Sequence, residues 1–217
     1  MVKYKHLIWD WNGTLIDDAW LCFEIFNRQI RHRNLPAVDF HYYRCNFTVP
    51  LRKALDKFGL KLSDDERQEF SREFFSEYEQ GFKSCQPHRG ALDMLERAKA
   101  AGLSQSVLSS LPISILKDQA PHFGFDTFMH PILGPDEWDG EGKIALGKRW
   151  IKDWHISPKE MLMLGDTDHD ADVAEAMGVD CILIPNGLQL RENLKQCKAH
   201  VCGDLFEAAG WIFRSQS

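Results

Sequence analysis

The chain has 217 residues, of which 44% are hydrophobic and 27% are charged, the usual balance of a soluble globular protein. Its net charge of −6 argues against a nucleic-acid partner, because phosphate backbones require a basic surface. No apolar run reaches the roughly 20 residues that cross a bilayer, and the N-terminus has no signal-peptide pattern. We therefore expect a cytoplasmic protein with no membrane partner.

The first predicted strand is the apolar run Leu7–Trp9, which ends at Asp10. After it, residues 17–84 are typical of helices throughout. The expected helices in this stretch are Ala19–Arg33, Pro50–Phe58 and a third that begins at the capping box Ser63–Glu66 and runs to about Phe82.

From Cys85 onward, short apolar runs alternate with amphipathic segments. We expect strands at 104–108, 128–133, 161–164, 181–184 and 199–202, and helices at 90–101, 113–123, 143–153, 170–177 and 205–213. Such alternation predicts an α/β fold with a doubly wound, Rossmann-like parallel sheet, covered by helices on both faces. The predicted domains are a core of residues 1–16 and 86–217 and an inserted helical module of residues 17–85.

The cysteines contain no C-x-x-C pair, which favours buried thiols in a reducing compartment over disulfides or a zinc site. The six are Cys22, Cys45, Cys85, Cys181, Cys197 and Cys202.

Polar residues follow several of the predicted strands. Asp10 ends the first strand, Ser109 and Ser110 follow the next, and an acidic run from Asp166 to Asp170 follows the strand at 161–164. Ligands bind at the carboxyl ends of the strands in open parallel sheets, so these side chains should meet. Carboxylates together with phosphate and water are the ligands that Mg²⁺ prefers.

These motifs resemble the haloacid dehalogenase superfamily, subfamily I, and within it the phosphoglycolate phosphatases. The resemblance covers nearly the whole chain. It rests on D-x-N-G-T at Asp10–Thr14, on Ser109, on Lys143, and on an apolar strand followed by G-D-x-x-x-D at Gly165–Asp170.

The resemblance implies that Asp10 is a nucleophile that becomes an aspartyl-phosphate. It implies Mg²⁺ held by Asp10, Asp166 and the main-chain carbonyl of Asn12, with Asp170 orienting Lys143 or a metal-bound water. Lys143 and the backbone N–H groups near residue 12 would bind the transferred phosphoryl group. The other residues expected to bind the substrate are Gly13, Thr14, Ser109, Ser110 and Arg52.

Alternatives remain for several residues. Lys148 competes with Lys143 as the motif lysine, and the two serines are also ordinary loop residues in composition. The aspartates from Asp166 to Asp170 are also what a helix N-terminus favours. His169 is expected at the surface or behind the site rather than as a catalyst.

Asn12 is the departure from the family's pattern, because its phosphatases carry an aspartic acid there as general acid and base. Such assistance contributes about 10²–10⁴ in rate, and an amide cannot transfer the proton. Three interpretations follow: a hydrolase for good leaving groups, a substitute such as His169 or an acid from the helical module, or a nearly inactive protein. We predict a Mg²⁺-dependent phosphatase of a small phosphorylated metabolite; the alternative is a protein that only binds a phosphorylated ligand or partner.

The helical module resembles the C1-type cap that closes over the site in this family. Substrate specificity is therefore expected in the segment 46–50 and at Arg52, whose guanidinium would bind a carboxylate or a second phosphate. The alternative for Arg52 is a solvated helix face. The sequence makes no prediction of the oligomeric state.

Overall fold

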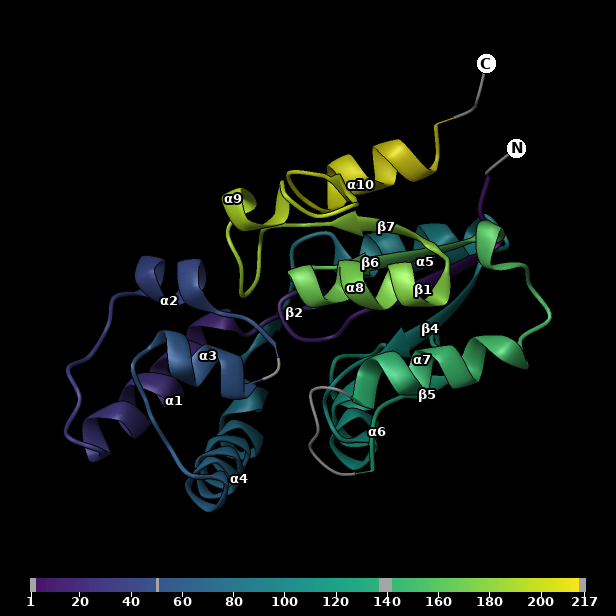
Figure 1. Ribbon diagram of the computed structural model, residues 1–217. Coiled ribbons are helices and arrows are strands. Elements are labelled where there is room, and N and C mark those ends of the chain that lie inside the picture. The colour runs from purple at the N-terminus through teal and green to yellow at the C-terminus, as the bar shows by residue number, and fades with distance from the viewer. Residues whose placement is uncertain (1–2, 50, 137–141, 215–217) are drawn as a thin grey trace.

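The computed structural model describes residues 3–49, 51–136 and 142–214, with the side chains of residues 51 and 52 left out. Its centre is a parallel six-stranded sheet in the order β5-β4-β1-β6-β7-β8 (Figure 1). The strands are β1 His6–Trp9, β4 Ser104–Leu108, β5 Ile132–Leu133, β6 Met161–Gly165, β7 Asp180–Leu183 and β8 His200–Val201.

The two faces of the sheet are both buried, which explains why its strands are nearly continuous apolar runs. Leu7 and Trp9 of β1 join one hydrophobic cluster, whereas Ile8 joins the other. One face is covered by α5 Ala91–Ala100 and α10 Leu205–Ile212, and the opposite face by α7 Gly142–Lys152 and α8 Asp168–Met177. Helices α6 Ile113–His122 and α9 Arg191–Leu194 and a 3-10 turn at Pro158–Glu160 also belong to this part of the chain. This arrangement confirms the predicted doubly wound α/β fold.

A helical insertion, residues 19–84, lies between β1 and β4 in the chain and to one side of the sheet (Figure 1). Its ends are joined by a small antiparallel pair, β2 Ile16–Asp17 with β3 Gln86–Pro87. The insertion contains α1 Ala19–His32, α2 Phe40–Asn46, α3 Leu51–Lys57, α4 Asp64–Gly81 and a 3-10 turn at Phe82–Ser84. The division of the chain into two domains remains a prediction.

Several elements differ from the sequence-based expectations. Helices α2 and α9 and the pair β2–β3 were not expected, and β5 is restricted to Ile132–Leu133. Helix α8 begins at Asp168 rather than at residue 170, because Thr167 and Asp170 form a capping box. The capping box of Ser63 and Glu66 at the start of α4 is confirmed.

The cysteine prediction is confirmed for pairing but only partly for burial. All six cysteines lie within the described ranges and are free thiols. Four are buried, whereas Cys45 and Cys197 are only half-buried.

Among the described residues, none of the helices combines the length and the apolar character that crossing a bilayer requires.

Candidate active site

A cavity of about 110 Å³ lies at the carboxyl ends of β1, β4 and β6, roofed by the helical insertion. The chain reverses its winding at β1, whose neighbours are β4 on one side and β6 on the other, and such a switch point opens a crevice. Asp10 follows β1, Ser109 follows β4 and Asp166 follows β6, so the topology alone brings these three side chains to one place.

Three buried carboxylates meet at the floor of this cavity. Oxygen atoms of Asp10, Asp166 and Asp170 all lie within 4.8 Å of one another. Lys143, from the first turn of α7 and only 2% exposed, places its Nζ 2.6 Å from an oxygen of Asp10 and 2.6 Å from an oxygen of Asp170. One ammonium therefore contacts two of the three clustered carboxyl groups in a region with little solvent.

Burial is the largest influence on the ionisation of these groups. It raises the pKa of Asp10 to about 7 against the attraction of Lys143, and it raises the pKa of Asp166 well above its ordinary value. Burial acts in the same direction on Asp170, but Lys143 and the Thr167 hydroxyl outweigh it and hold the pKa of Asp170 below its ordinary value. Burial lowers the pKa of Lys143, yet its two carboxylate partners prevail and raise it. A further cation would favour the ionised forms of Asp10 and Asp166.

Asp170 is fixed by its hydrogen bonds. Its Oδ2 accepts from the backbone N–H groups of Asp166 and Thr167 at 3.2 and 3.0 Å and from the Thr167 hydroxyl at 2.7 Å. Its Oδ1 is thereby left for Lys143. A Cβ at Gly165 would lie 2.3 Å from Asp170 Cγ, so glycine is needed for this approach. Asp170 therefore orients the lysine from behind.

The Asp166 side chain is closely surrounded by backbone groups. Its Oδ2 accepts from the Leu188 N–H at 2.6 Å, and Thr14 Oγ1 lies 3.3 Å from its Oδ1. A Cβ at Gly13 would lie 2.3 Å from Asp166 Oδ2, and one at Gly187 would lie 2.1 Å from it. Only glycine fits at these two positions, and Gly13 also has a φ of +73°.

This donor set fits a hard divalent cation. Three buried carboxyl groups lie together and only two of them contact the single ammonium, so a dication would compensate the remaining charge that burial makes unfavourable. The main-chain carbonyl of Asn12 adds a suitable oxygen, because no backbone hydrogen bond to it is found within the described ranges.

The side chain of Asn12 points to a second buried carboxylate. Its Nδ2 donates to Asp18 Oδ2 and to the hydroxyl of Tyr78, the latter at 2.6 Å. The Tyr78 hydroxyl in turn donates to Asp18 Oδ2 at 2.6 Å, and the Gly13 N–H donates to Asp18 Oδ1 at 2.9 Å. Burial raises the pKa of Asp18 despite these donors. Both amide hydrogens of Asn12 are thus occupied, and no described residue donates to its Oδ1.

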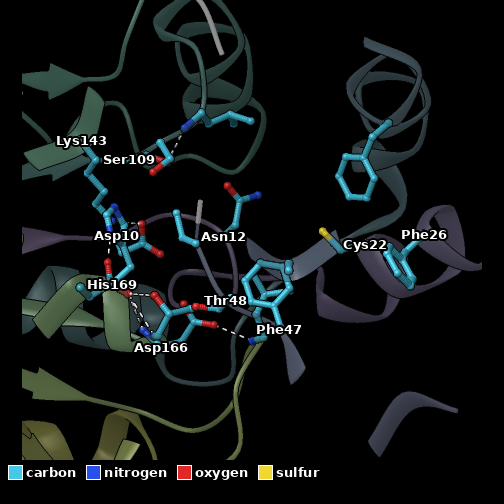
Figure 2. A pocket seen from close by; sticks show the side chains of 18 of the residues that line it. Asp10, Asn12, Cys22, Phe26, Phe47, Thr48, Ser109, Lys143, Asp166 and His169 are labelled. Carbon is cyan, nitrogen blue, oxygen red and sulfur yellow. Dashed lines mark hydrogen bonds and ion pairs between the residues drawn. The ribbon is translucent and has the colours of Figure 1, made fainter. Parts of the chain in front are cut away.

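The other half of the cavity wall is apolar. Figure 2 shows Asp10, Lys143 and Asp166 gathered on one side, Cys22 and Phe26 on the other, and Asn12 between them. The lining residues from the helical insertion are Cys22, Phe26, Tyr43, Phe47, Thr48, Val49, Ala54, Phe58, Phe74, Phe75 and Tyr78.

The insertion is tied to the sheet-bearing part of the chain by hydrogen bonds beside the cavity. Arg44 of α2 donates to the carbonyls of Pro185 and Gln189 at 2.7 and 2.9 Å. The Gln189 side chain donates back to the Phe47 carbonyl at 2.9 Å. These bonds hold the insertion over the cavity.

Most of the predicted site residues line this one cavity: Asp10, Asn12, Ser109, Ser110, Lys143, Asp166 and Asp170. Gly13 and Thr14 lie directly against the Asp166 side chain. Lys143 is in the cavity, whereas Lys148 is exposed and lines a neighbouring groove. The side chain of Arg52 lies outside the described residues.

His169 is not at the surface, because only 6% of it is exposed and it lines the cavity. Burial, then the nearby Lys143, lowers the pKa of His169, which favours a neutral imidazole. Its Nε2 has no hydrogen-bond partner among the described residues. Asp18 and Tyr78 were missed by the sequence reasoning, although the acidic pair Asp17–Asp18 directly after D-x-N-G-T-L-I was a signal for the first of them.

Comparisons with known proteins place the chain among similar sequences and folds. Over 179 residues, the chain is 24% identical to the tyrosine-protein kinase PtkA of Mycobacterium tuberculosis, covering 82% of this chain and 61% of that protein. It therefore spans less than two thirds of PtkA. It is 26% identical over 186 residues to the phosphoglycolate phosphatase of Vibrio vulnificus, covering 81% of each.

A crystal structure from Clostridium acetobutylicum, described as a predicted phosphatase, has the same fold. Its TM-score is 0.84 at 18% identity, covering 96% of this chain and 98% of that one. Residues 7–184 match the family described as haloacid dehalogenase-like hydrolase. Since this match runs from β1 past β7 and includes every strand end at the cavity, the chain belongs to the haloacid dehalogenase-like hydrolases.

Proposed function

We propose that the protein is a Mg²⁺-dependent phosphatase that hydrolyses a small phosphorylated metabolite through an aspartyl-phosphate on Asp10. The supporting observation is the buried cluster in which Lys143 joins Asp10 to Asp170 beside Asp166. Such a cluster provides a carboxylate nucleophile and a fixed cation for the charge of a phosphoryl group.

In this proposal, an oxygen of Asp10 attacks phosphorus and the bond from phosphorus to the leaving oxygen breaks. Water then attacks the aspartyl-phosphate and regenerates Asp10. Lys143, held by Asp170, binds a phosphoryl oxygen, and the hydroxyls of Ser109 and Ser110 bind others. The enclosed cavity keeps bulk water away from these groups.

Asp10, Asp166 and the main-chain carbonyl of Asn12 would hold Mg²⁺. Once bound, the ion would neutralise phosphoryl charge and orient that group toward Asp10. Thr14 and Gly13 support this role, because the threonine hydroxyl lies between the two carboxylates and the glycine leaves space beside Asp166.

Asn12 stands where the family's phosphatases carry an aspartic acid. Its amide hydrogens are occupied by Asp18 and Tyr78, so only its carbonyl oxygen faces the substrate. That oxygen can accept a hydrogen bond from the attacking water but cannot protonate a leaving group. The proposed enzyme therefore orients water through Asn12 and receives little acid assistance.

The helical segment 17–85 is proposed to act as a cap that excludes water and determines substrate specificity. The hydrogen bonds of Arg44 and Gln189 across the cavity edge support a closed position. The proposed location is the cytoplasm, which the free cysteines support.

The test is phosphate release from acetyl phosphate and from phosphoglycolate, with and without Mg²⁺, by the wild type and by Asp10→Asn. We expect Mg²⁺-dependent release by the wild type and none by the variant. Release that persists in Asp10→Asn would exclude the aspartyl-phosphate. A wild type that binds phosphate analogues but releases no phosphate from either compound would favour a binding protein instead.

A further inference from the structure

The cavity is divided between two kinds of wall, and the apolar half has not been used by the proposed reaction. The Asp and Lys side chains that line it, Asp10, Lys143, Asp166 and Asp170, belong to the sheet end of the cavity. The helical insertion contributes mainly aromatic and aliphatic side chains, which line the part of the cavity away from these charged groups (Figure 2).

The rings of this half are mutually arranged for contact with another ring. Phe26 and Phe58 have centroids 4.5 Å apart at 52°, and Phe74 and Phe75 have centroids 5.1 Å apart at 62°. Tilted and edge-to-face arrangements at these separations are the favourable ones for aromatic groups. A planar ring in the cavity beside these residues would meet ring faces and ring edges to pack against.

A charged leaving group would be poorly received in the same place. Among the lining residues that the structure describes, the helical insertion supplies no lysine or arginine. A carboxylate there would lose its hydration and gain no cationic partner from these described residues, only the hydroxyls of Tyr43, Thr48 and Tyr78 beside it, which is unfavourable. The size also sets a limit: the whole cavity, polar floor included, has about 110 Å³, less than the apolar cavity of about 150 Å³ that accepts benzene, so the leaving group must be small.

The hydrogen bonds of the Asn12 side chain place a second, independent constraint on the leaving group. Its two amide hydrogens are already donated to Asp18 and Tyr78, so Asn12 offers no proton to a departing oxygen. The leaving group must then depart as an anion. A phenol, with a pKa of about 10, does so far more readily than an aliphatic hydroxyl, whose acidity is close to that of water at about 15.7.

We propose that the substrate is a phosphate monoester of a small, uncharged aromatic hydroxyl compound. This inference rests on the phosphatase function proposed above. Asp10 forms a bond to phosphorus as the bond to the aryl oxygen breaks, and that oxygen leaves with the electron pair as a phenolate. Water then adds to phosphorus, its proton passes to a phosphoryl oxygen and Asp10 is regenerated. The phenolate finally takes a proton from the released dihydrogen phosphate.

The first experiment compares kcat/KM for phenyl phosphate, ethyl phosphate and phosphoglycolate in the presence of Mg²⁺. We expect phenyl phosphate to be preferred by at least about 30-fold, the scale set by burying one ring. Equal or better hydrolysis of phosphoglycolate would overturn the inference and leave the phosphatase function intact. Hydrolysis of none of the three, with acetyl phosphate also inert, would remove both.

The second experiment separates binding from turnover. Binding of phenylphosphonate and of phosphonoacetate to Asp10→Asn is measured by calorimetry, and the aryl compound should bind at least about tenfold more tightly. Tighter binding of phosphonoacetate than of phenylphosphonate would overturn the inference. If Arg52→Ala then abolished that preference for phosphonoacetate, Arg52 would be identified as the group that holds the carboxylate.

The wall is tested at Phe74, a half-buried residue of α4 that lines the cavity. Phe74→Ala should lower kcat/KM for phenyl phosphate about tenfold. The kcat/KM for acetyl phosphate, which is too short to reach Phe74, should change by less than about threefold. Phe40→Ala is the matched control, because Phe40 belongs to the insertion but is 36% exposed and outside the cavity lining. Phe74→Leu keeps the test available if the alanine variant does not fold. Equal losses on both substrates would contradict an aryl site.

Discussion

Asn12 donates its side-chain amide to Asp18, a carboxylate with 0% exposure that lies six residues further along the chain. The pair connects the loop after β1 to the start of α1, where the helical insertion begins. Tyr78, 60 residues beyond Asp18, closes the triangle from α4. A carboxylate is thus present beside position 12, but it belongs to residue 18 and is held away from the cavity by its own hydrogen bonds.

Exchanging the two residues should preserve this interaction. Asn12→Asp alone sets two carboxylates against each other and removes both amide donors, so we expect it to lower the free energy of unfolding by about 2–4 kcal/mol. The double variant Asn12→Asp/Asp18→Asn restores one carboxylate and one amide. Urea denaturation of the four proteins should give a coupling energy above about 1 kcal/mol, and strictly additive losses would show that the pair does not interact.

The same exchange should alter activity toward poor leaving groups. It places a carboxyl group at residue 12, where it can protonate a departing oxygen. We expect kcat/KM for ethyl phosphate to rise by about 10²-fold while that for acetyl phosphate changes little, because an acyl phosphate needs no such assistance. A uniform rise on both substrates would indicate better binding rather than proton transfer.

The buried Asp10 predicts a pH-dependent stability when Mg²⁺ is withheld. Its pKa is raised to about 7, so the folded state binds a proton between about pH 4 and pH 7 that the unfolded state has lost. This contribution to the free energy of unfolding therefore falls as the pH rises through that window. Relative to the wild type in EDTA, Asp10→Asn should gain about 2–3 kcal/mol between pH 5 and pH 8. Urea titrations at each pH measure the difference.

Adding Mg²⁺ should remove most of that difference, because the cation favours the ionised carboxylate that Asp10→Asn lacks. A difference between the two proteins that stays constant from pH 5 to pH 8 in EDTA would show that Asp10 does not titrate in this range. A Mg²⁺ effect of equal size on both proteins would place the ion elsewhere.

Gly187 should be intolerant of any side chain because of its position against Asp166. A Cβ there would lie 2.1 Å from Asp166 Oδ2 and 2.5 Å from Gly13 Cα, so Gly187→Ala must displace the carboxylate. We expect Mg²⁺ affinity to fall at least about tenfold by calorimetry. Activity should be partly recovered at high Mg²⁺.

Gly210→Ala provides the control for this substitution. Gly210 lies inside α10, and no atom of the residues that the structure describes lies within 4 Å of the added Cβ, so alanine should stabilise the helix by about 0.5–1 kcal/mol and leave Mg²⁺ affinity unchanged. Equal Mg²⁺ affinities in the two variants would argue against Asp166 as a ligand.

Arg44 is expected to control closure of the helical insertion. Arg44→Met removes both hydrogen bonds to the carbonyls of Pro185 and Gln189, which are worth roughly 1.5–3 kcal/mol because the donor is charged. The KM should rise about tenfold, with faster proteolysis near residues 85–88. Arg28→Met, which breaks an exposed pair with Glu77, should leave both unchanged. A rise in KM of the same size in both variants would count against a specific closing contact.

The sequence predicts the sheet and the cavity floor better than the cavity roof. Residues at strand ends, such as Asp10 and Asp166, can be recognised from the local sequence pattern. The parallel topology then brings their side chains together, so no long-range information is needed. Helix α2 was missed because its residues, FHYYRCN, are poor helix formers. It is held by long-range contacts such as the packing of Tyr43 against Phe26 and Phe58.

The helical insertion that roofs the cavity is held by contacts between residues far apart in the chain, which no local sequence pattern predicts. Tyr78 meets Asn12 across 66 residues of chain, and Arg44 meets Gln189 across 145. The strands β2 and β3 have two residues each, too few for any periodicity to be recognised. The amide at position 12 is visible in the sequence, whereas its hydrogen bond to Asp18 follows only from the folded geometry.

The placement of β1 has a consequence for how the protein is made. It is synthesised before either of its neighbours in the sheet, which are residues 104–107 and 161–164. At roughly 5–20 residues per second, the newborn chain waits on the order of ten seconds or more before the second neighbour is synthesised. The helices of the insertion can gather their own aromatic side chains during that interval, whereas the apolar residues of β1 have no sheet to join. Binding of chaperones to nascent chains should therefore concentrate on the first dozen residues and end once residue 165 has emerged.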